Sequence, residues 1–278
     1  MANPMHRDPI QRFLRRSAGL LTAALVASSL GCVTTYSNPP LSPTAVSESV
    51  AKRDLGIDYL VSHRTAMAIR QFRASMDLDS GDPETHLWLG EAYRRKGKTE
   101  DAEGLFLNAI RLAEGPELVA TRHAARLNLS ALLSQMGRYE DSLEHCEALA
   151  EDPTFSTPWR PLTNCGWALL QLGRLNEAGS HFEDALDFFP RFGPALLNLG
   201  ILRTRQGKAL AAIEALEGAL DSRRLTNSAL GEAHYRLGEI YVKIGRRDKA
   251  VIHFRQATEK APLEDWGSQS QAYLDLLH

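Results

Sequence analysis

The sequence is poor in cysteine and has no excess of charge of either sign. Three cysteines in 278 residues exclude a small domain held together by several disulfides. The formal net charge is −2, from 32 basic and 34 acidic residues that are interleaved along the chain. Because nucleic-acid-binding proteins gather Lys and Arg on one face, we expect no nucleic-acid partner.

The sequence also lacks the motifs of catalytic and cofactor sites. It contains no HExxH zinc motif, no Walker phosphate loop, no nucleophile elbow and no CxxC pair. Its nine histidines are scattered without metal-ligand spacing. We therefore predict a protein that is not an enzyme, with no cofactor, no metal and no small-molecule substrate. The alternative of a helical-repeat hydrolase or transferase would need a cluster of acids, bases or ligands that the sequence does not show.

No apolar run reaches the roughly 20 residues that a transmembrane helix needs. The uncharged, apolar stretch 18–30 follows four arginines, which is the pattern of a secretory signal peptide. We assign residues 1–31 to this peptide. The following residues, 32–48, are rich in proline and poor in apolar side chains, so they predict a flexible tether.

The end of the signal peptide resembles the bacterial lipobox, in which a small residue precedes a cysteine that is acylated. The residues are Ser29, Leu30, Gly31 and Cys32, and Ser29 departs from the leucine usual at that place. The resemblance implies lipidation at Cys32. The next residue is Val33 rather than the aspartate that retains enteric lipoproteins at the inner membrane, which implies an outer-membrane anchor with the remaining chain in the periplasm. An ordinary signal peptide with an incidental cysteine is the alternative.

After residue 48 a spaced pattern of small and large residues recurs along the chain, and we call this pattern the ladder. Each copy has a glycine after a leucine or cysteine, a second glycine seven residues later, and then alanine, a bulky apolar residue and alanine. Small residues allow close helix approach, and the second glycine ends the first helix of a pair. The four best copies are Gly90, Gly97, Ala102, Phe106, Ala109; Gly166, Gly173, Ala178, Phe182, Ala185; Gly200, Gly207, Ala212, Leu216, Ala219; and Gly238, Gly245, Ala250, Phe254, Ala257.

This ladder resembles the signature of the tetratricopeptide repeat, a helix-turn-helix unit of 34 residues. The resemblance implies an all-α fold, a right-handed α-solenoid of six repeats with a C-terminal capping helix. Because the turn glycines lie up to 40 residues apart, we also expect insertions in the loops near 115–121, 156–158 and 224–230. The expected repeats are 49–82, 83–116, 123–156, 159–192, 193–226 and 231–263, which we call units one to six, followed by the cap at 264–278.

The resemblance also implies a groove for a protein partner on the concave side, lined by the first helix of each unit. The middle of the groove is apolar with a central tryptophan, a composition typical of partner-binding surfaces. If the register is displaced by one residue, some of these side chains belong to the core instead. The family's groove positions fall on Leu87, Glu91, Arg94, Leu127, Ala131, Thr163, Trp167, Leu170, Leu197, Ile201, Tyr235 and Glu239.

Cys146 and Cys165 both stand at signature positions. Cys146 takes the bulky position on the second helix of unit three, and Cys165 takes the leucine position on the first helix of unit four. These helices are consecutive in the expected stack. The two residues form either a disulfide, which an exported protein can acquire, or two free thiols that pack as small apolar side chains.

Six such units behind a lipoprotein signal resemble the pilotins of type IV pili, the PilF/PilW/Tgl family of outer-membrane lipoproteins. The resemblance implies a pilotin or assembly factor that binds secretin monomers in the periplasm. It also implies that the protein promotes secretin multimerisation in the outer membrane, and hence pilus formation and twitching or gliding motility. The alternative is a lipoprotein scaffold of the same architecture that docks periplasmic cell-wall enzymes.

Overall fold

A computed structural model describes residues 41–222 and 225–277 of the chain. The predicted signal peptide and Cys32 lie outside these described residues. Every regular element in the described part is helical, comprising thirteen α-helices and one short 3₁₀ helix, without a strand. The prediction of an all-α solenoid is confirmed. None of the described helices has the length and apolar character needed to cross a membrane.

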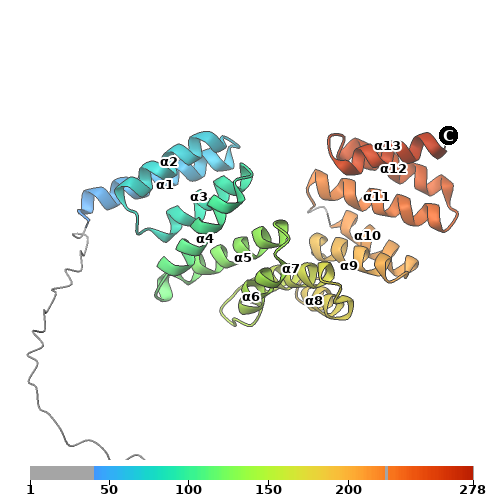
Figure 1. Ribbon diagram of the computed structural model, residues 1–278, viewed down its shortest axis with the longest axis horizontal. Helices are drawn as coiled ribbons and strands as arrows, with labels where there is room; N and C mark the ends of the chain where they lie inside the picture. The colour runs from blue at the N-terminus through green and yellow to red at the C-terminus, as the bar shows by residue number, and fades with distance from the viewer. Residues whose placement is uncertain (1–40, 223–224, 278) are drawn as a thin grey trace, which may run out of the picture. The chain divides into compact units, whose positions relative to one another are not determined.

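The α-helices form six successive pairs and a final single helix (Figure 1). They are α1 (Pro43–Val61) and α2 (Thr65–Leu78); α3 (Pro83–Arg95) and α4 (Thr99–Leu112); α5 (Val119–Gln135) and α6 (Tyr139–Ala150); α7 (Trp159–Gln171) and α8 (Leu175–Phe188); α9 (Gly193–Arg205) and α10 (Ala209–Asp221); α11 (Asn227–Lys243) and α12 (Arg247–Lys260); and α13 (Asp265–Leu277). The 3₁₀ helix, η2 (Pro116–Leu118), precedes α5.

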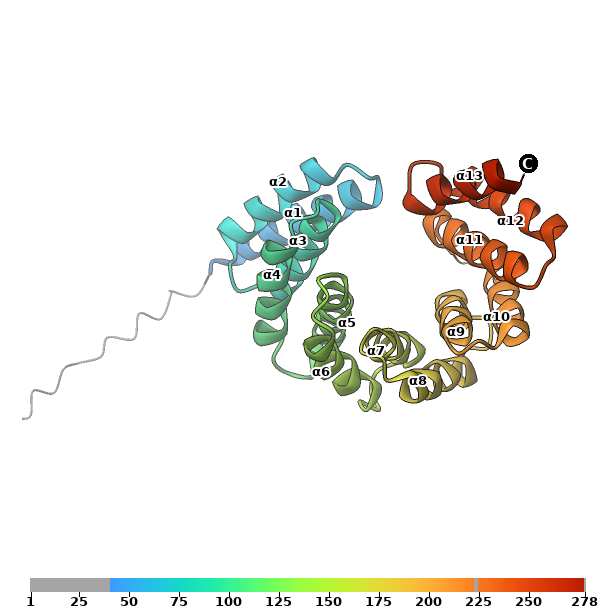
Figure 2. The same cartoon turned by 45° about the vertical axis from the view of Figure 1, so that its right-hand side comes forward.

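The helices stack in two layers within the unit that begins at Leu41. Each helix packs on the next along the chain, and each odd-numbered helix also packs on the following odd-numbered one. Among the described residues, even-numbered helices do not contact one another. Odd-numbered helices therefore form a continuous inner layer, which Figure 2 shows on the inner side of the stack.

Helix α3 illustrates why these segments are helical. The Asp82 carboxylate accepts hydrogen bonds from the backbone N–H groups of Glu84 and Thr85, at 3.1 and 3.3 Å, and Pro83 takes the first helical position. At the other end, Gly97 adopts a φ of 73°, a left-handed conformation that ends the helix at little steric cost.

Within most units, a glycine of the first helix lies against a phenylalanine of the second. A Cβ added at Gly90 would lie 2.8 Å from the Phe106 ring, so only glycine permits this approach. The same pairing recurs in Gly56–Phe72, Gly166–Phe182 and Gly238–Phe254.

The hydrophobic core comprises two large clusters and a small one, and the division between the two large clusters falls inside unit three. One cluster of buried side chains extends from α1 to α5, and another extends from α6 to α13. Three buried serines, Ser130, Ser134 and Ser142, lie at the α5–α6 boundary. Polar contacts thus replace apolar packing at this point in the array.

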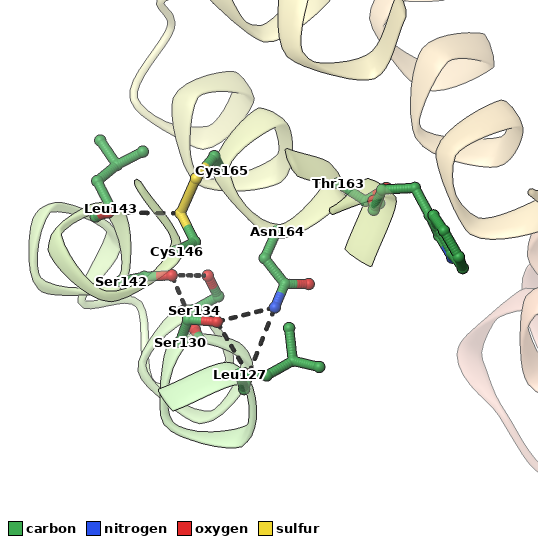
Figure 3. Close-up of a disulfide and its surroundings, with 10 residues drawn as sticks. Leu127, Ser130, Ser134, Ser142, Leu143, Cys146, Thr163, Asn164 and Cys165 are labelled. Atoms are coloured by element: carbon green, nitrogen blue, oxygen red, sulfur yellow. Dashed lines mark hydrogen bonds between the residues drawn. A yellow bond between two sulfur atoms is a disulfide. The ribbon is translucent and has the colours of Figure 1, made fainter. Parts of the chain in front are cut away.

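Unit three departs from the ladder in a coordinated way. Ser130 replaces the usual glycine and Ser142 the usual alanine, while Cys146 stands in place of phenylalanine. Because Cys146 is smaller than a phenyl ring, the Ser130 side chain has the room that Gly90 lacks. Figure 3 shows the resulting network: Ser142 donates to the Ser130 carbonyl at 2.8 Å, and the Asn164 amide donates to the Ser130 hydroxyl at 2.8 Å.

Cys146 and Cys165 are joined by a disulfide between α6 and α7 (Figure 3). Their sulfur atoms lie 2.08 Å apart and their Cα atoms 5.6 Å apart. Both cysteines are fully buried. The bond therefore links unit three to unit four beside the polar network.

The structure corrects the predicted end of the tether. Helix α1 begins at Pro43, with Ser42 as its N-cap, so the tether predicted over 32–48 is wrong for its last six residues. Proline is compatible with the first helical turn, which is why its presence did not stop the helix.

Two of the three predicted insertions also differ from what we expected. Helices α5 and α11 have 17 residues, whereas α3 has 13, because residues expected in the loops near 115–121 and 224–230 extend these helices. The segment 151–158, between α6 and α7, is a loop as expected near 156–158, and the segment 113–118, between α4 and α5, contains η2.

Candidate protein-binding groove

Most of the predicted groove residues are buried, although Leu127, Ala131 and Thr163 line a cleft between α5 and α7. Eight of the twelve are buried, while Arg94, Trp167 and Glu239 are partly exposed and Ala131 is exposed. The groove prediction is corrected accordingly, since a register displacement places many of these side chains in the core. The buried ones are Leu87, Glu91, Leu127, Thr163, Leu170, Leu197, Ile201 and Tyr235.

Glu91 and Arg94 belong to an ion network on α3. The Glu91 carboxylate accepts hydrogen bonds from Arg94 at 2.7 and 2.9 Å and from Arg95 at 2.7 Å. Burial alone would raise the pKa of Glu91, but the hydrogen bonds from the two arginines outweigh it and lower this pKa. Arg95 also donates to the Leu60 carbonyl at 3.0 Å, so the network ties α3 to α1.

A stripe of solvent-accessible side chains on α5 and α7 follows a spacing of four, three and four residues, and on α9 the buried Ile201 interrupts it. This spacing follows one face of an α-helix. On α5 and α7, the polar side chains of this stripe are a sequence signal that the groove prediction missed. The stripe comprises Ala124, Asn128, Ala131 and Gln135 on α5; Arg160, Asn164, Trp167 and Gln171 on α7; and Pro194, Asn198 and Arg205 on α9.

Two adjoining clefts lie along this stripe, and together we call them the central groove. The larger, of about 390 Å³, is lined by α5 and by the 151–158 loop, including Ala124 and Phe155. The smaller, of about 210 Å³, lies between α5 and α7 and is closed by Phe192 and Pro194. Leu127 and Arg160 line both clefts, so the two are continuous.

The wall of the larger cleft is fixed by hydrogen bonds. The Asp152 carboxylate accepts from the Thr154 hydroxyl at 2.6 Å and backbone N–H at 2.8 Å, and it pairs with Nε2 of His123 at 2.8 Å. The Thr154 bonds, followed by the His123 bond, lower the pKa of Asp152 to about 2. The His123 ring meets Phe155 edge to face at 5.2 Å. These contacts hold the 151–158 loop against α5.

Arg160 lies exposed at the junction of the two clefts. Within residues 41–222 and 225–277, its guanidinium forms no ion pair or hydrogen bond. A cation without a protein partner, placed between apolar clefts, is available to a carboxylate or carbonyl of a ligand.

On α11, the capping helix covers Tyr235. The Tyr235 ring lies 5.4 Å from the Trp266 ring and 6.2 Å from the Tyr273 ring, between ring centroids. The Arg236 guanidinium lies over the Trp266 ring at 4.9 Å and also pairs with Glu239 at 3.6 Å. Tyr235 and Glu239 therefore contribute to the junction with α13 and not to an open groove.

The described part of the chain contains no group of three or more His, Cys, Asp or Glu side chains that could hold a metal ion. It does contain two adjoining clefts, a cation without a protein partner at their junction, and partly exposed side-chain amides on the inner helices.

Solved structures similar to this chain include two type IV pilus proteins. PilW, described as a widely conserved type IV pilus biogenesis factor, has a TM-score of 0.67 at 17% identity, over 80% of this chain and 98% of PilW. PilF of Pseudomonas aeruginosa has a TM-score of 0.64 at 17% identity, over 83% of this chain and 99% of PilF. Cut9 in the APC/C complex with Hcn1 reaches 0.69 at 20% identity, but only 42% of that chain is covered. At these identities the likeness establishes the fold alone.

Family models described as tetratricopeptide repeat match residues 53–117, 159–184 and 193–262. The intervening unit three is not matched, in agreement with its substitutions at Ser130, Ser142 and Cys146. A search of curated proteins finds no match to this sequence. The repeat ladder, the paired helices and the family models agree, and the chain is built of tetratricopeptide repeats.

Proposed function

We propose that this protein is an outer-membrane lipoprotein that acts as a pilotin for the type IV pilus secretin. In this role it binds secretin monomers in the periplasm through its repeats and promotes their assembly into the outer-membrane pore. The tetratricopeptide fold is a protein-interaction scaffold, and the catalytic motifs that an enzyme would need are missing from the sequence.

The observation that carries this proposal is the nearly complete coverage of two type IV pilus proteins, at 98% of PilW and 99% of PilF. The similarity to Cut9 indicates that the fold serves other assemblies too, so the fold alone does not identify a partner. The predicted signal peptide and the lipobox-like segment ending in Cys32 add support, because they account for export and membrane attachment.

In the proposed mechanism, two parts of the chain have separate roles. A lipid on Cys32 gives the protein its location at the outer membrane. The central groove supplies recognition, holding a secretin segment until contacts between secretin subunits replace it. Membrane attachment also raises the effective concentration of bound secretin near the bilayer.

The test is the state of the secretin in a strain that lacks this protein. We expect loss of the heat-resistant secretin oligomer on a gel, with monomer still present, and loss of pili. Wild-type protein should restore the oligomer, whereas Cys32→Ala should restore it poorly. Unchanged oligomer in the deletion strain would contradict the proposal, and altered cell shape with normal pili would favour a scaffold for cell-wall enzymes.

A further inference from the structure

In each repeat unit, a basic residue stands at the N-cap of the second helix. In units two to four, an acidic residue three positions later pairs with this cation and neutralises it. The pairs are Lys98–Asp101, Arg138–Asp141 and Arg174–Glu177. This arrangement agrees with the helix dipole, because the N-terminus of a helix favours a negative charge.

Units five and six lack this acidic residue. In unit five, the residue three positions after Lys208 is Ala211. In unit six, the residue three positions after Arg246 is another cation, Lys249, and Arg247 takes the first position of α12. A cation at the start of a helix is unfavourable for the helix dipole, so the stability of α10 and α12 does not account for these charges.

The turns of units five and six lie side by side. Helix α9 packs on α11, and both run in the same direction because α10 runs back between them in the chain. Although basic and acidic residues are interleaved along the whole chain, the segments 203–210 and 243–249 contain seven basic residues and one acidic residue, Asp248. We call these two segments the basic edge. Its cations are Arg203, Arg205, Lys208, Lys243, Arg246, Arg247 and Lys249.

Three cations of the basic edge have no acidic partner. Lys208, Lys243 and Arg247 are exposed, and their side chains form no ion pair or hydrogen bond with another described residue. Asp248 pairs with Arg246 at 3.6 Å and does not neutralise them. The edge therefore keeps a net positive charge that is available to an anionic partner.

Two exposed apolar side chains stand among these cations. Leu210 in the first turn of α10 is 81% exposed, and Ile244 at the C-cap of α11 is 43% exposed. Apolar side chains among Lys and Arg are typical of surfaces that lie on anionic lipid, where the cations meet the headgroups and the apolar groups enter the interface. A nucleic acid would pair with the cations but would leave Leu210 in water. The cations also lie on long side chains without fixed partners, which suits a fluid headgroup layer better than a folded protein.

We propose that the basic edge lies on an anionic phospholipid surface, with its three unpaired cations at the headgroups and Leu210 and Ile244 inserted between them. This contact goes beyond the proposed function, which attributes membrane attachment to Cys32 alone. It gives the array a second point of attachment, and thereby a fixed orientation on the bilayer instead of free rotation about a tether.

Sedimentation with lipid vesicles tests this contact on the chain from residue 33. Leu41–His278 form a compact unit by themselves, so this chain keeps the array while it lacks the predicted signal peptide and Cys32. One set of vesicles contains phosphatidylglycerol with phosphatidylethanolamine, and the neutral set contains phosphatidylcholine alone. Soluble polyglutamate is the second probe, because it carries negative charge without an apolar interior.

Two pairs of variants separate the charges from the apolar contacts. The members of the first pair each neutralise three exposed cations, either on the basic edge or elsewhere. They are Lys208→Gln with Lys243→Gln and Arg247→Gln, and, as the control, Arg70→Gln with Arg111→Gln and Arg255→Gln. The second pair compares Leu210→Ser with Leu263→Ser, which changes a leucine that is 99% exposed outside the edge.

We expect wild type to sediment with the anionic vesicles, to stay in solution with the neutral ones, and to be released from the anionic vesicles by salt. The triple variant of the basic edge should bind at least ~10-fold more weakly than wild type, and the control triple variant nearly as well as wild type. Leu210→Ser should also weaken vesicle binding, whereas Leu263→Ser should not.

No binding to anionic vesicles, or an equal loss in the two triple variants, would overturn the inference. Binding to polyglutamate without binding to vesicles would overturn it too, and would assign the edge to an acidic protein. Equal vesicle binding by Leu210→Ser and wild type would overturn the insertion of Leu210. Unchanged secretin oligomer in the deletion strain would refute the pilotin role and leave this result standing, because no secretin enters the assay.

Discussion

Gly90 and Ser130 occupy equivalent positions on neighbouring inner helices, yet they meet different surroundings. Gly90 faces the ring of Phe106 with no room for a side chain. Ser130 faces the smaller Cys146 and uses the space for a hydroxyl that bonds Asn164. At the scale of single residues, each unit is thus stabilised by a matched pair across its two helices, and one member cannot change independently of the other.

This pairing predicts that two similar substitutions lower the free energy of unfolding by different amounts. Gly90→Ala should destabilise the protein by about 1–3 kcal/mol, because the new methyl group would overlap the Phe106 ring. Ser130→Ala keeps the side-chain carbon and loses two hydrogen bonds, one to the Leu127 carbonyl and one from Asn164, whose net contribution is about 1 kcal/mol. Urea unfolding of wild type and the two full-length variants measures both losses of unfolding free energy. Equal losses would mean that the Phe106 ring moves aside for the new methyl group without cost.

At the residue scale, a pair of histidines between α11 and α12 also predicts that the stability of the fold depends on pH. Nδ1 of His234 lies 3.1 Å from Nδ1 of His253. Burial, followed by His253 and Lys260, lowers the pKa of His234 to about 4, while nearby Glu259 opposes this shift. Burial also lowers the pKa of His253, which faces Glu217 and Lys249.

Because the unfolded chain binds these protons more readily, the stability supplied by neutral His234 is fully present above about pH 6.5. It should be lost as the pH falls towards 4. Thermal unfolding between pH 7 and 4.5 should therefore show a steeper loss for wild type than for His234→Gln. If the melting temperatures of wild type and His234→Gln fall equally over this pH range, the loss of stability does not come from His234.

At the scale of helices, α6 is joined to α5 by polar contacts and to α7 by a disulfide together with apolar packing. The serine network replaces apolar packing between α5 and α6, and the Cys146–Cys165 disulfide fastens α6 to α7. A disulfide stabilises chiefly by restricting the unfolded chain, although the size of this effect depends on the reference state.

Removal of the disulfide should destabilise the array by about 3 kcal/mol, the value expected for a closed loop of this length. The variant Cys146→Ala with Cys165→Ala should show faster amide hydrogen exchange in α6 and α7 than wild type. Exchange in α3 and α12, which are remote from the bond, should change little and serves as the internal control. Uniformly faster exchange would indicate that the whole array unfolds as one unit.

At the scale of the whole array, the groove joins side chains from several units into one surface. Arg160 is its free cation, so Arg160→Glu should reverse the charge that a partner meets without disturbing the core. We expect the twitching zone to shrink to that of the deletion strain while the melting temperature stays unchanged. Arg255→Glu, an exposed change on α12, is the matched control. Normal twitching with Arg160→Glu would remove this residue from the partner surface.

The sequence specified the helix pairs because the ladder encodes local steric needs. Gly90 and Phe106 must meet in one unit, and the same need recurs in units one, four and six. The open surface is different, because exposure depends on how neighbouring inner helices pack. Leu170 and Leu197 are buried by that packing, although their positions in the signature suggested a groove.

Other parts of the site come from departures from the repeat. Phe155 lies in the longer 151–158 loop, which no repeat pattern describes, and its position is set by His123 and Asp152. Tyr235 occupies a predicted groove position but is covered by α13, whose docking could not be read from the ladder. The repeat pattern therefore predicts the stack of helices well, whereas the binding surface depends on segments outside that pattern, such as the 151–158 loop and α13.

The 151–158 loop lies between the two bonded cysteines along the chain, so it is part of a covalent ring closed by Cys146 and Cys165. A protease that cuts this loop would open the wall of the larger cleft. It would not separate the chain into two pieces, because the sulfur–sulfur bond bypasses the cut. The nicked protein would run as a single species on a gel until a reductant is added, and its two halves would stay joined through the sulfur–sulfur bond.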